Sequence, residues 1–161
     1  MALRNDPFQP EVHMYKHILI PTDGSELAAH GVTEGLSIAK SVGAKVTVVV
    51  VETPFNVMSV RESRARHLGE EFEKHNEQSD KDAAAVLAHA SDKAKAINVS
   101  CETLQVEHEQ PYQAIIAAAK KKDCDLIVMA SHGRSGISAL VLGSVTNKVL
   151  THTKTPVLVC H

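Results

Sequence analysis

The clearest fold signal in the chain is DLIVMASHGRSGISALVLGSVTNKVLTHTKTPVLVC, residues 125–160. It opens with the aliphatic run Asp125–Ser131 and closes with a second one, Pro156–Cys160. Both runs have the length and the β-branched content of strands rather than of helices. Between them lie a glycine-containing loop and a short helical pattern that begins at Ser144. The stretch therefore predicts a strand, a loop, a helix and a second strand.

Three further segments upstream have the composition of strands: His17–Thr22, Lys45–Val51 and Ser100–Glu107. Four of the resulting five strands are nearly continuous aliphatic runs, which is typical of parallel strands buried on both faces. Only Ser100–Glu107 alternates polar and apolar residues, so this strand is expected nearer an edge of the sheet. The one irregular stretch, Pro54–His67, is expected to form a lid or a partly helical excursion.

Amphipathic segments between the strands predict three more helices. Ser25 and Gly43 are the expected N-cap and C-terminal stop of the first. An apolar period near 3.6 residues predicts the second between Leu68 and Ile97, and Pro111 fits the first turn of the third. Strands and helices thus alternate from one end to the other. This order predicts an α/β fold, an open doubly wound parallel five-stranded sheet flanked by helices.

The chain of 161 residues is expected to form one domain, residues 16–161, after a flexible N-terminal extension, residues 1–15. With a net charge of −2 and 3% aromatic residues, a broad nucleic-acid or anionic-membrane surface is not expected. The longest aliphatic run, Val46–Val51, is too short to cross a membrane, and residues 1–15 lack the apolar segment of a signal peptide. These features predict a cytoplasmic protein whose partners include neither nucleic acid nor a membrane.

Ligands of open α/β sheets bind beyond the carboxyl ends of the strands, where the strand order reverses. Three segments follow such ends: Pro21–Ser25, Val51–Pro54 and Ala130–Ser144. The last contains Gly133 and Gly143 and leads into a helix. Glycine lets a backbone approach a phosphate closely, and a helix start offers unpaired N–H groups to an anion. The same residues would equally serve as a plain turn and a helix cap, so both interpretations stay open.

Three stretches resemble the universal stress protein family: HILIPTDGS at residues 17–25, VVVVETP at residues 48–54, and residues 125–159 of the stretch quoted above. The resemblance covers the chain from Lys16 to Cys160. It implies the doubly wound fold, binding of an adenine nucleotide and a homodimer.

The nucleotide-binding branch of that family carries the pattern G-x2-G-x9-G-[ST]. This sequence aligns with it as Ala130, Gly133, Gly143 and Ser144. Ala130 therefore replaces the first glycine of the pattern. Its methyl group would weaken binding if the backbone approaches the ribose closely there.

The resemblance also implies the roles of single residues. Asp23 would face the adenosine, and Val51 would contact adenine through its backbone. Residues around Gly133 would line the ribose and the first phosphates, and residues around Ser144 would hold the outer phosphates. The expected set is Pro21, Thr22, Asp23, Val51, Met129, Ala130, His132, Gly133, Arg134, Gly143, Ser144 and Val145. The expected ligand is ATP or AMP, with Mg²⁺ or Mn²⁺ carried by the phosphates and no metal site formed by the protein alone.

Three classes of function stay open. The favoured one is a regulatory or protective dimer in stress response that binds an adenine nucleotide with little or no turnover. The others are a dimeric scaffold that has lost nucleotide binding and a slow ATP hydrolase. The glycine loop has no Walker lysine, since Ser144 and Val145 follow its last glycine, which argues against efficient phosphoryl transfer. The homodimer is expected to form through Pro156–Cys160, an aliphatic strand that only Pro156 protects from edge pairing.

Overall fold

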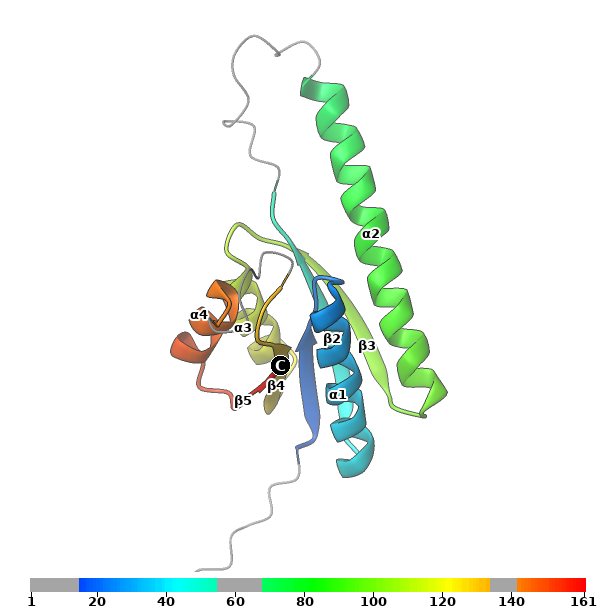
Figure 1. Cartoon of the computed structure of the whole chain (residues 1–161), viewed down its shortest axis with the longest axis vertical. Helices are drawn as coiled ribbons and strands as arrows, with labels where there is room; N and C mark the ends of the chain where they lie inside the picture. Colours follow the sequence, from blue (N-terminus) through cyan, green and yellow to red (C-terminus); the bar gives the residue numbers. More distant parts are fainter. Residues whose placement is uncertain (1–14, 55–67, 134–141) are drawn as a thin grey trace, which may run out of the picture.

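All five strands lie parallel in one sheet, in the order β3-β2-β1-β4-β5 (Figure 1). The computed structural model describes residues 15–54, 68–133 and 142–161. The elements in chain order are β1 (His17–Pro21), α1 (Glu26–Val42), β2 (Lys45–Glu52), α2 (Leu68–Ala96), β3 (Cys101–Glu107), α3 (Pro111–Lys121), β4 (Leu126–Ala130), α4 (Ser144–His152) and β5 (Val157–Cys160). The predicted open, doubly wound, five-stranded parallel sheet is confirmed, and so is the edge position of β3.

The strand order reverses between β1 and β4, and this reversal distributes the helices over the two faces. Helices α1 and α2 cover one face and bury a first core against it. Helices α3 and α4 cover the other face over a second core. The first core includes Val48 and Val128, and the second includes Val49 and Ile127. Because successive strand residues point to opposite faces, β2 and β4 are buried on both sides, as their aliphatic runs predict.

The helix boundaries follow from local chemistry that the sequence makes visible. Ser25 caps α1, and its Oγ accepts the Ala28 N–H at 3.2 Å. Gly43 ends the helix in the left-handed conformation, with φ 72°, which glycine adopts without the cost that a side chain adds. Pro111 occupies the first turn of α3, where its missing N–H is not needed. All three expected boundaries are confirmed.

One sequence expectation about the strands is wrong. The aliphatic run of β5 predicts burial on both faces, but every residue of this strand is partly or largely exposed. The side chain of Leu158 is 41% exposed. The physical reason is its position, since β5 is an edge strand with β4 as its single neighbour in the sheet.

Two expected segments lie wholly or largely outside the described residues, namely the extension at residues 1–15, of which Tyr15 is described, and the stretch Pro54–His67, of which Pro54 is described. Within the described ranges, none of the helices combines the length and the apolar character needed to cross a membrane.

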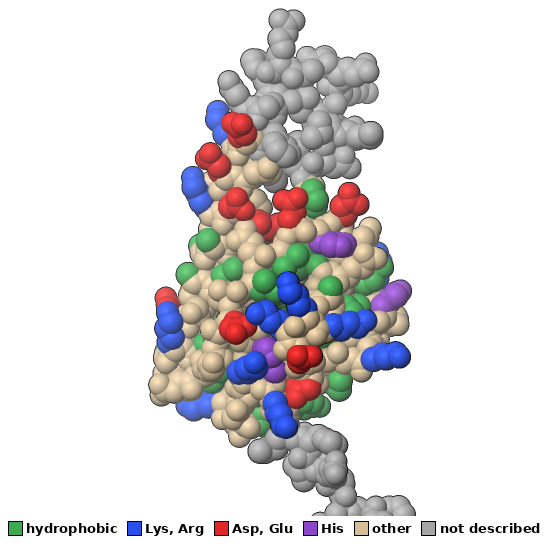
Figure 2. Space-filling view, turned by 180° about the vertical axis from the view of Figure 1, so that it is seen from behind, with side chains coloured by type: hydrophobic (Ala, Val, Ile, Leu, Met, Phe, Trp, Pro, Cys, Tyr) green, Lys and Arg blue, Asp and Glu red, His purple; other side chains and the backbone are tan. Residues whose placement is uncertain are grey.

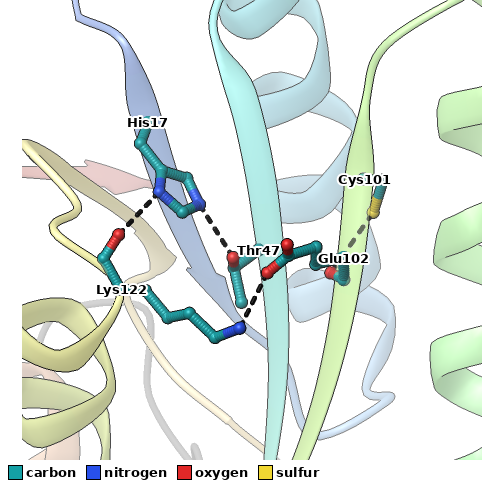
Figure 3. A network of polar contacts seen from close by, with 5 residues as sticks. All are labelled: His17, Thr47, Cys101, Glu102 and Lys122. Carbon is teal, nitrogen blue, oxygen red and sulfur yellow. Dashed lines mark hydrogen bonds and ion pairs between the residues drawn. The ribbon is translucent and has the colours of Figure 1, made fainter.

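A buried histidine holds the amino end of the sheet (Figure 3). His17 is 3% exposed; its Nδ1 lies 2.8 Å from the Lys122 carbonyl oxygen and its Nε2 2.8 Å from Thr47 Oγ1. A carbonyl oxygen only accepts, so Nδ1 carries the proton and Nε2 accepts the Thr47 hydroxyl. Burial lowers the pKa of His17, and the charge of Lys45 lowers it further, against opposing contributions that include Glu102. The fold therefore uses the neutral imidazole.

This arrangement predicts that the protein loses stability as the pH falls below about 6.5, the ordinary pKa of histidine. The unfolded chain takes up a proton at His17 there, whereas the folded protein resists it until a lower pH, so the unfolded state binds more protons in that window. In His17→Gln the free energy of unfolding, measured in urea between pH 7.5 and pH 5, should fall less steeply with acidification. His30→Gln, a change at an exposed histidine, should keep the parent slope. Equal slopes for all three proteins would show that His17 is not the titrating group.

Candidate functional site

Two turns meet where the strand order reverses, one after β1 and one after β4. Asp23 in the first lies against Gly133 in the second, because a Cβ placed on Gly133 would collide with Asp23 Oδ2. The absence of a side chain at Gly133 therefore lets the carboxylate approach the loop backbone. This contact joins two of the predicted site residues at the position that the fold rule selects.

The β1–α1 turn is fixed by its own side chains. Thr22 is buried, and its N–H donates to the Val49 C=O at 2.9 Å. Thr22 Oγ1 accepts the Gly24 N–H at 3.3 Å, and Asp23 Oδ1 accepts the Ser25 N–H at 3.0 Å. Gly24 itself has φ 77°. Asp23 thus performs the turn role that an Asp-Gly pair suggests, while its other oxygen faces the loop after β4.

The start of α4 is anchored to the end of β4. The Gly143 N–H donates to the Ser131 C=O at 2.8 Å, and Thr146 Oγ1 donates to the Ala130 C=O at 2.9 Å. A Cβ at Gly143 would lie 2.9 Å from the Ser131 carbonyl oxygen and 3.2 Å from His132 Cα. Glycine is needed at 143 for this packing, in addition to any contact with a ligand. Thr146 and Ser131, which anchor the helix, are absent from the predicted set of site residues. The sequence signals them only through their hydroxyl groups next to the glycine pattern.

The first turn of α4 differs from that of α1 in its capping and in its charge. Its N-cap residue, Gly143, has no side chain to cap the helix, and the first turn contains no acidic residue. The first turn of α1 differs, because Ser25 caps it and Glu26 supplies a negative charge. Exposed Ser144 and half-buried Val145 therefore present their N–H groups at the positive end of an uncompensated helix dipole.

Ala130, which replaces the first glycine of the family pattern, is accommodated in the interior. It is 6% exposed and lies on the face of β4 that Leu126 and Val128 present to α1. Helix α1 passes this point at Gly31, where an added Cβ would lie 3.3 Å from the Ala130 backbone nitrogen. The Ala130 methyl group packs beneath α1, so it does not stand over the strand ends where a ligand would approach.

Val51 presents backbone groups near the turn after β1. The last backbone hydrogen bond between β1 and β2 in the described residues joins Thr22 N–H to Val49 C=O. Alternate residues of a strand direct their N–H and C=O to the same side, so those of Val51 point the same way as those of Val49. They lie beyond the place where the chain turns away at Gly24. A ligand with a hydrogen-bonding group could therefore reach the Val51 N–H and C=O from the β1 side.

The remaining predicted site residues differ in burial and in side-chain contacts. Pro21 is half-buried at the end of β1, and Met129 is 5% exposed with its side chain in the second core. His132 Nδ1 lies 3.0 Å from Ser131 Oγ. The other ring nitrogen, Nε2, is buried and has no hydrogen-bond partner in the part of the chain that the structure describes. Arg134 lies outside the described residues.

The described residues contain no group of three or more histidine, cysteine, aspartate or glutamate side chains arranged to hold a metal ion. The cysteines Cys101, Cys124 and Cys160 are free thiols. Burial raises the pKa of the Cys124 thiol to about 11, so this group stays protonated and unreactive at neutral pH.

With this geometry in hand, comparison with known proteins identifies the family. The profile of the universal stress protein family matches residues 14–161. The chain belongs to the universal stress protein family. The universal stress protein MJ0531 of Methanocaldococcus jannaschii is 31% identical over 149 residues, which cover 91% of this chain and 82% of that protein. The universal stress protein YxiE of Bacillus subtilis is 31% identical over 148 residues, covering 91% and 99%.

A solved universal stress protein in complex with cAMP superposes with a TM-score of 0.65 at 27% sequence identity, covering 92% of this chain and 98% of that one. The resemblance seen in the sequence is thus confirmed at the level of family and fold.

Proposed function

We propose that this universal stress protein binds an adenine nucleotide, ATP or AMP, across the strand-order reversal between β1 and β4. It would act as a regulatory or protective homodimer in stress response, with little or no turnover. The observation that carries the proposal is the start of α4, which lacks a side-chain cap and an acidic residue and is anchored beside the turn that holds Asp23. The two turns come together at the strand-order reversal, which is the place where open α/β sheets bind their ligands.

The phosphates would lie on the α4 start. Gly143, Ser144 and Val145 would offer backbone N–H groups there, and Ser144 would add its hydroxyl. Gly133, whose missing side chain lets Asp23 approach the loop backbone, would keep that carboxylate beside the bound phosphates. The buried Nε2 of His132 is a further polar atom that a ribose or phosphate oxygen would satisfy.

The charge distribution would orient the ligand. A row of acidic side chains lies near the carboxyl ends of the strands on the face shown in Figure 2, and basic and acidic side chains are mixed below that row. Glu52, Asp80, Glu107 and Glu109 belong to the β2 and β3 end of the sheet, and all but half-buried Glu52 are exposed. These carboxylates would repel phosphate and leave the β2 end to the uncharged base. Val51 then offers its backbone C=O and N–H to adenine.

The solved relative that is in complex with cAMP supports an adenine nucleotide as the ligand class. A Mg²⁺ or Mn²⁺ ion would arrive on the phosphates, with Asp23 as the nearest carboxylate of the described site. The loop from Ser131 to Ser144 contains Arg134 but no lysine. Efficient phosphoryl transfer relies on positioned positive charge, so hydrolysis would be slow or absent. A cytoplasmic location belongs to the same proposal, because free thiols suit a reducing compartment.

The homodimer would form through β5. Its outer edge presents the backbone groups of Val157 and Val159, because the Pro156 and Cys160 carbonyls bond to β4 instead. No charged residue interrupts this strand, whereas the opposite edge strand β3 begins and ends near Glu102 and Glu107 and is thereby protected. Antiparallel pairing of two β5 strands across a two-fold axis would satisfy the edge and cover exposed Leu158.

Ser144→Asp provides the sharpest test of the nucleotide site. An aspartate in the first turn of α4 should leave stability unchanged or raise it by about 0.3–1 kcal/mol, because it complements the helix dipole. The same charge should repel phosphate and weaken ATP binding at least about tenfold, a difference of about 1.4 kcal/mol. Ser144→Asn, of the same size without the charge, should bind within a few-fold of the parent.

Calorimetry with ATP·Mg²⁺ on nucleotide-free protein gives the affinities, and thermal melts give the stabilities. If the parent shows no heat with millimolar ATP, the protein is a scaffold without a nucleotide. If Ser144→Asp binds as tightly as the parent, the phosphates do not lie at α4. An ATPase rate near the enzyme median of about 10 s⁻¹, lost in Asp23→Ala, would favour the hydrolase instead.

The dimer has its own test. Leu158→Lys places a charge on the exposed side chain of β5, and the ladder to β4 needs only its backbone. Light scattering at micromolar concentration should give twice the 17.4 kDa chain mass for the parent and a mass near the monomer for this variant. Thr103→Lys, the matched change at an exposed position of the opposite edge strand, should stay dimeric. A monomeric parent, or a dimer that survives Leu158→Lys and Val159→Lys together, would rule out pairing through β5.

A further inference from the structure

The side chain of Glu52 ties together three elements at the carboxyl edge of the sheet. One carboxylate oxygen accepts a hydrogen bond from Ser79 Oγ of α2. The other accepts from Gln105 Nε2 of β3 at 2.6 Å, and the same amide nitrogen donates to Asp80 Oδ1 at 2.9 Å. The main chain of Glu52 is held as well, because its C=O accepts the His108 N–H at 2.9 Å. Glu52 is therefore fixed both through its backbone and through both oxygens of its side chain.

The strand register explains why these groups meet. Glu52 follows Val48 and Val50 on the face of β2 that packs against α1 and α2. Val50 pairs with Gln105 in the ladder between β2 and β3, so the Gln105 amide reaches Glu52 as a diagonal neighbour on the same face. Helix α2 passes over this point, and its N-terminal part continues beyond the sheet (Figure 1). The hydrogen bonds to Glu52 lie where the helix leaves the strands.

Val51 and Glu52 share one peptide unit, which carries the Val51 C=O and the Glu52 N–H. A peptide unit is planar and turns as one body, so holding Glu52 also sets the direction of the Val51 carbonyl. The ladder to β3 holds this end of the strand on one side, where Val51 pairs with Val106 and Glu52 with Glu107. The Glu52 side chain adds an attachment to α2 through Ser79. The Glu52 contacts thus act as a clamp on the last peptide of β2.

We propose that Glu52 is a positioning residue that makes the site selective for adenine, an inference that rests on the proposed function. Adenine presents the N6 amino group as a donor beside N1 as an acceptor. Hypoxanthine presents the reverse, an O6 acceptor beside an N1–H donor. The Val51 C=O, whose direction follows Glu52, and the Val51 N–H, on the preceding peptide in the ladder to β3, match the first pattern and mismatch the second. A strand end that is free to turn would lose this discrimination while the phosphate contacts at α4 remained.

The test compares ATP with ITP, which share the ribose and the triphosphate and differ in the 6-position of the base. Calorimetry should show the parent binding ATP at least about tenfold more tightly than ITP, because unpaired polar groups penalise the mismatched base. In Glu52→Ala the ratio of ATP to ITP affinity should fall to within about threefold, because the lost charge affects both triphosphates alike and only the base contact of ATP is weakened. Gln105→Ala, which removes one of the two side-chain contacts, should lie between them. Glu102→Gln, which breaks the ion pair with Lys122 at the other end of β3, should keep the parent ratio.

Circular dichroism melts of each variant separate folding from recognition, since a purely structural clamp would lower the melting temperature and leave the ATP-to-ITP ratio unchanged. That result in folded Glu52→Ala, or in Gln105→Ala if Glu52→Ala does not fold, would overturn the inference. A parent that binds both nucleotides equally would also overturn it and leave the proposed function standing. A parent that binds neither would overturn the proposed function itself.

Discussion

The backbone of Gly143 lies directly against the end of β4, where its N–H donates to the Ser131 carbonyl at 2.8 Å. A side chain at this position would meet that carbonyl oxygen at 2.9 Å, closer than packed atoms tolerate. Thr146, in the first turn of α4, donates its hydroxyl to the Ala130 carbonyl and so ties the helix to the end of β4. Every feature of the candidate site depends on this junction, because it holds the N-terminus of α4 at the strand-order reversal.

The same junction explains how a chain with a net charge of only −2 can form a site for a charged ligand. The two helices that start at the reversal differ in their first turns. Ser25 and Glu26 compensate the dipole of α1, and the first turn of α4 has neither kind of group. The start of α4 therefore presents the positive end of a helix dipole that no capping side chain or acidic residue of its first turn offsets. The other end of the site, over β2 and β3, is acidic, and this difference favours one direction for an extended anionic ligand with an uncharged base.

The fold was predictable because its signals are local. Aliphatic runs, the cap at Ser25, the left-handed stop at Gly43 and Pro111 at a helix start each act within a few residues, and their alternation selects the doubly wound sheet. The proposed set of site residues rests on the family resemblance, since a glycine pattern alone also fits a turn and a helix cap. The exposure of Leu158 contradicts the burial that an aliphatic run indicates, and it agrees with the edge position that pairing through Pro156–Cys160 requires.

What the sequence did not reveal are contacts between distant segments. His17 reaches Thr47 and the Lys122 carbonyl across three elements, and Glu52 meets Gln105 only because β2 and β3 pair in one register. No regular spacing along the sequence marks such contacts between distant residues. They become visible when the sheet order is known, as does the buried position of Ala130 on the face of β4 that packs against α1.

We propose that an adenine nucleotide binds between the β1–α1 turn and the start of α4. An amide-resolved NMR titration of the ¹⁵N-labelled protein with ATP tests it most directly. The largest shifts should fall on Asp23, Val51, Gly143, Ser144 and Val145, while amides at the amino end of the sheet, such as those of Lys45 and Cys101, stay unchanged. Shifts confined to the amino end, or no shifts at millimolar ATP, would contradict the claim.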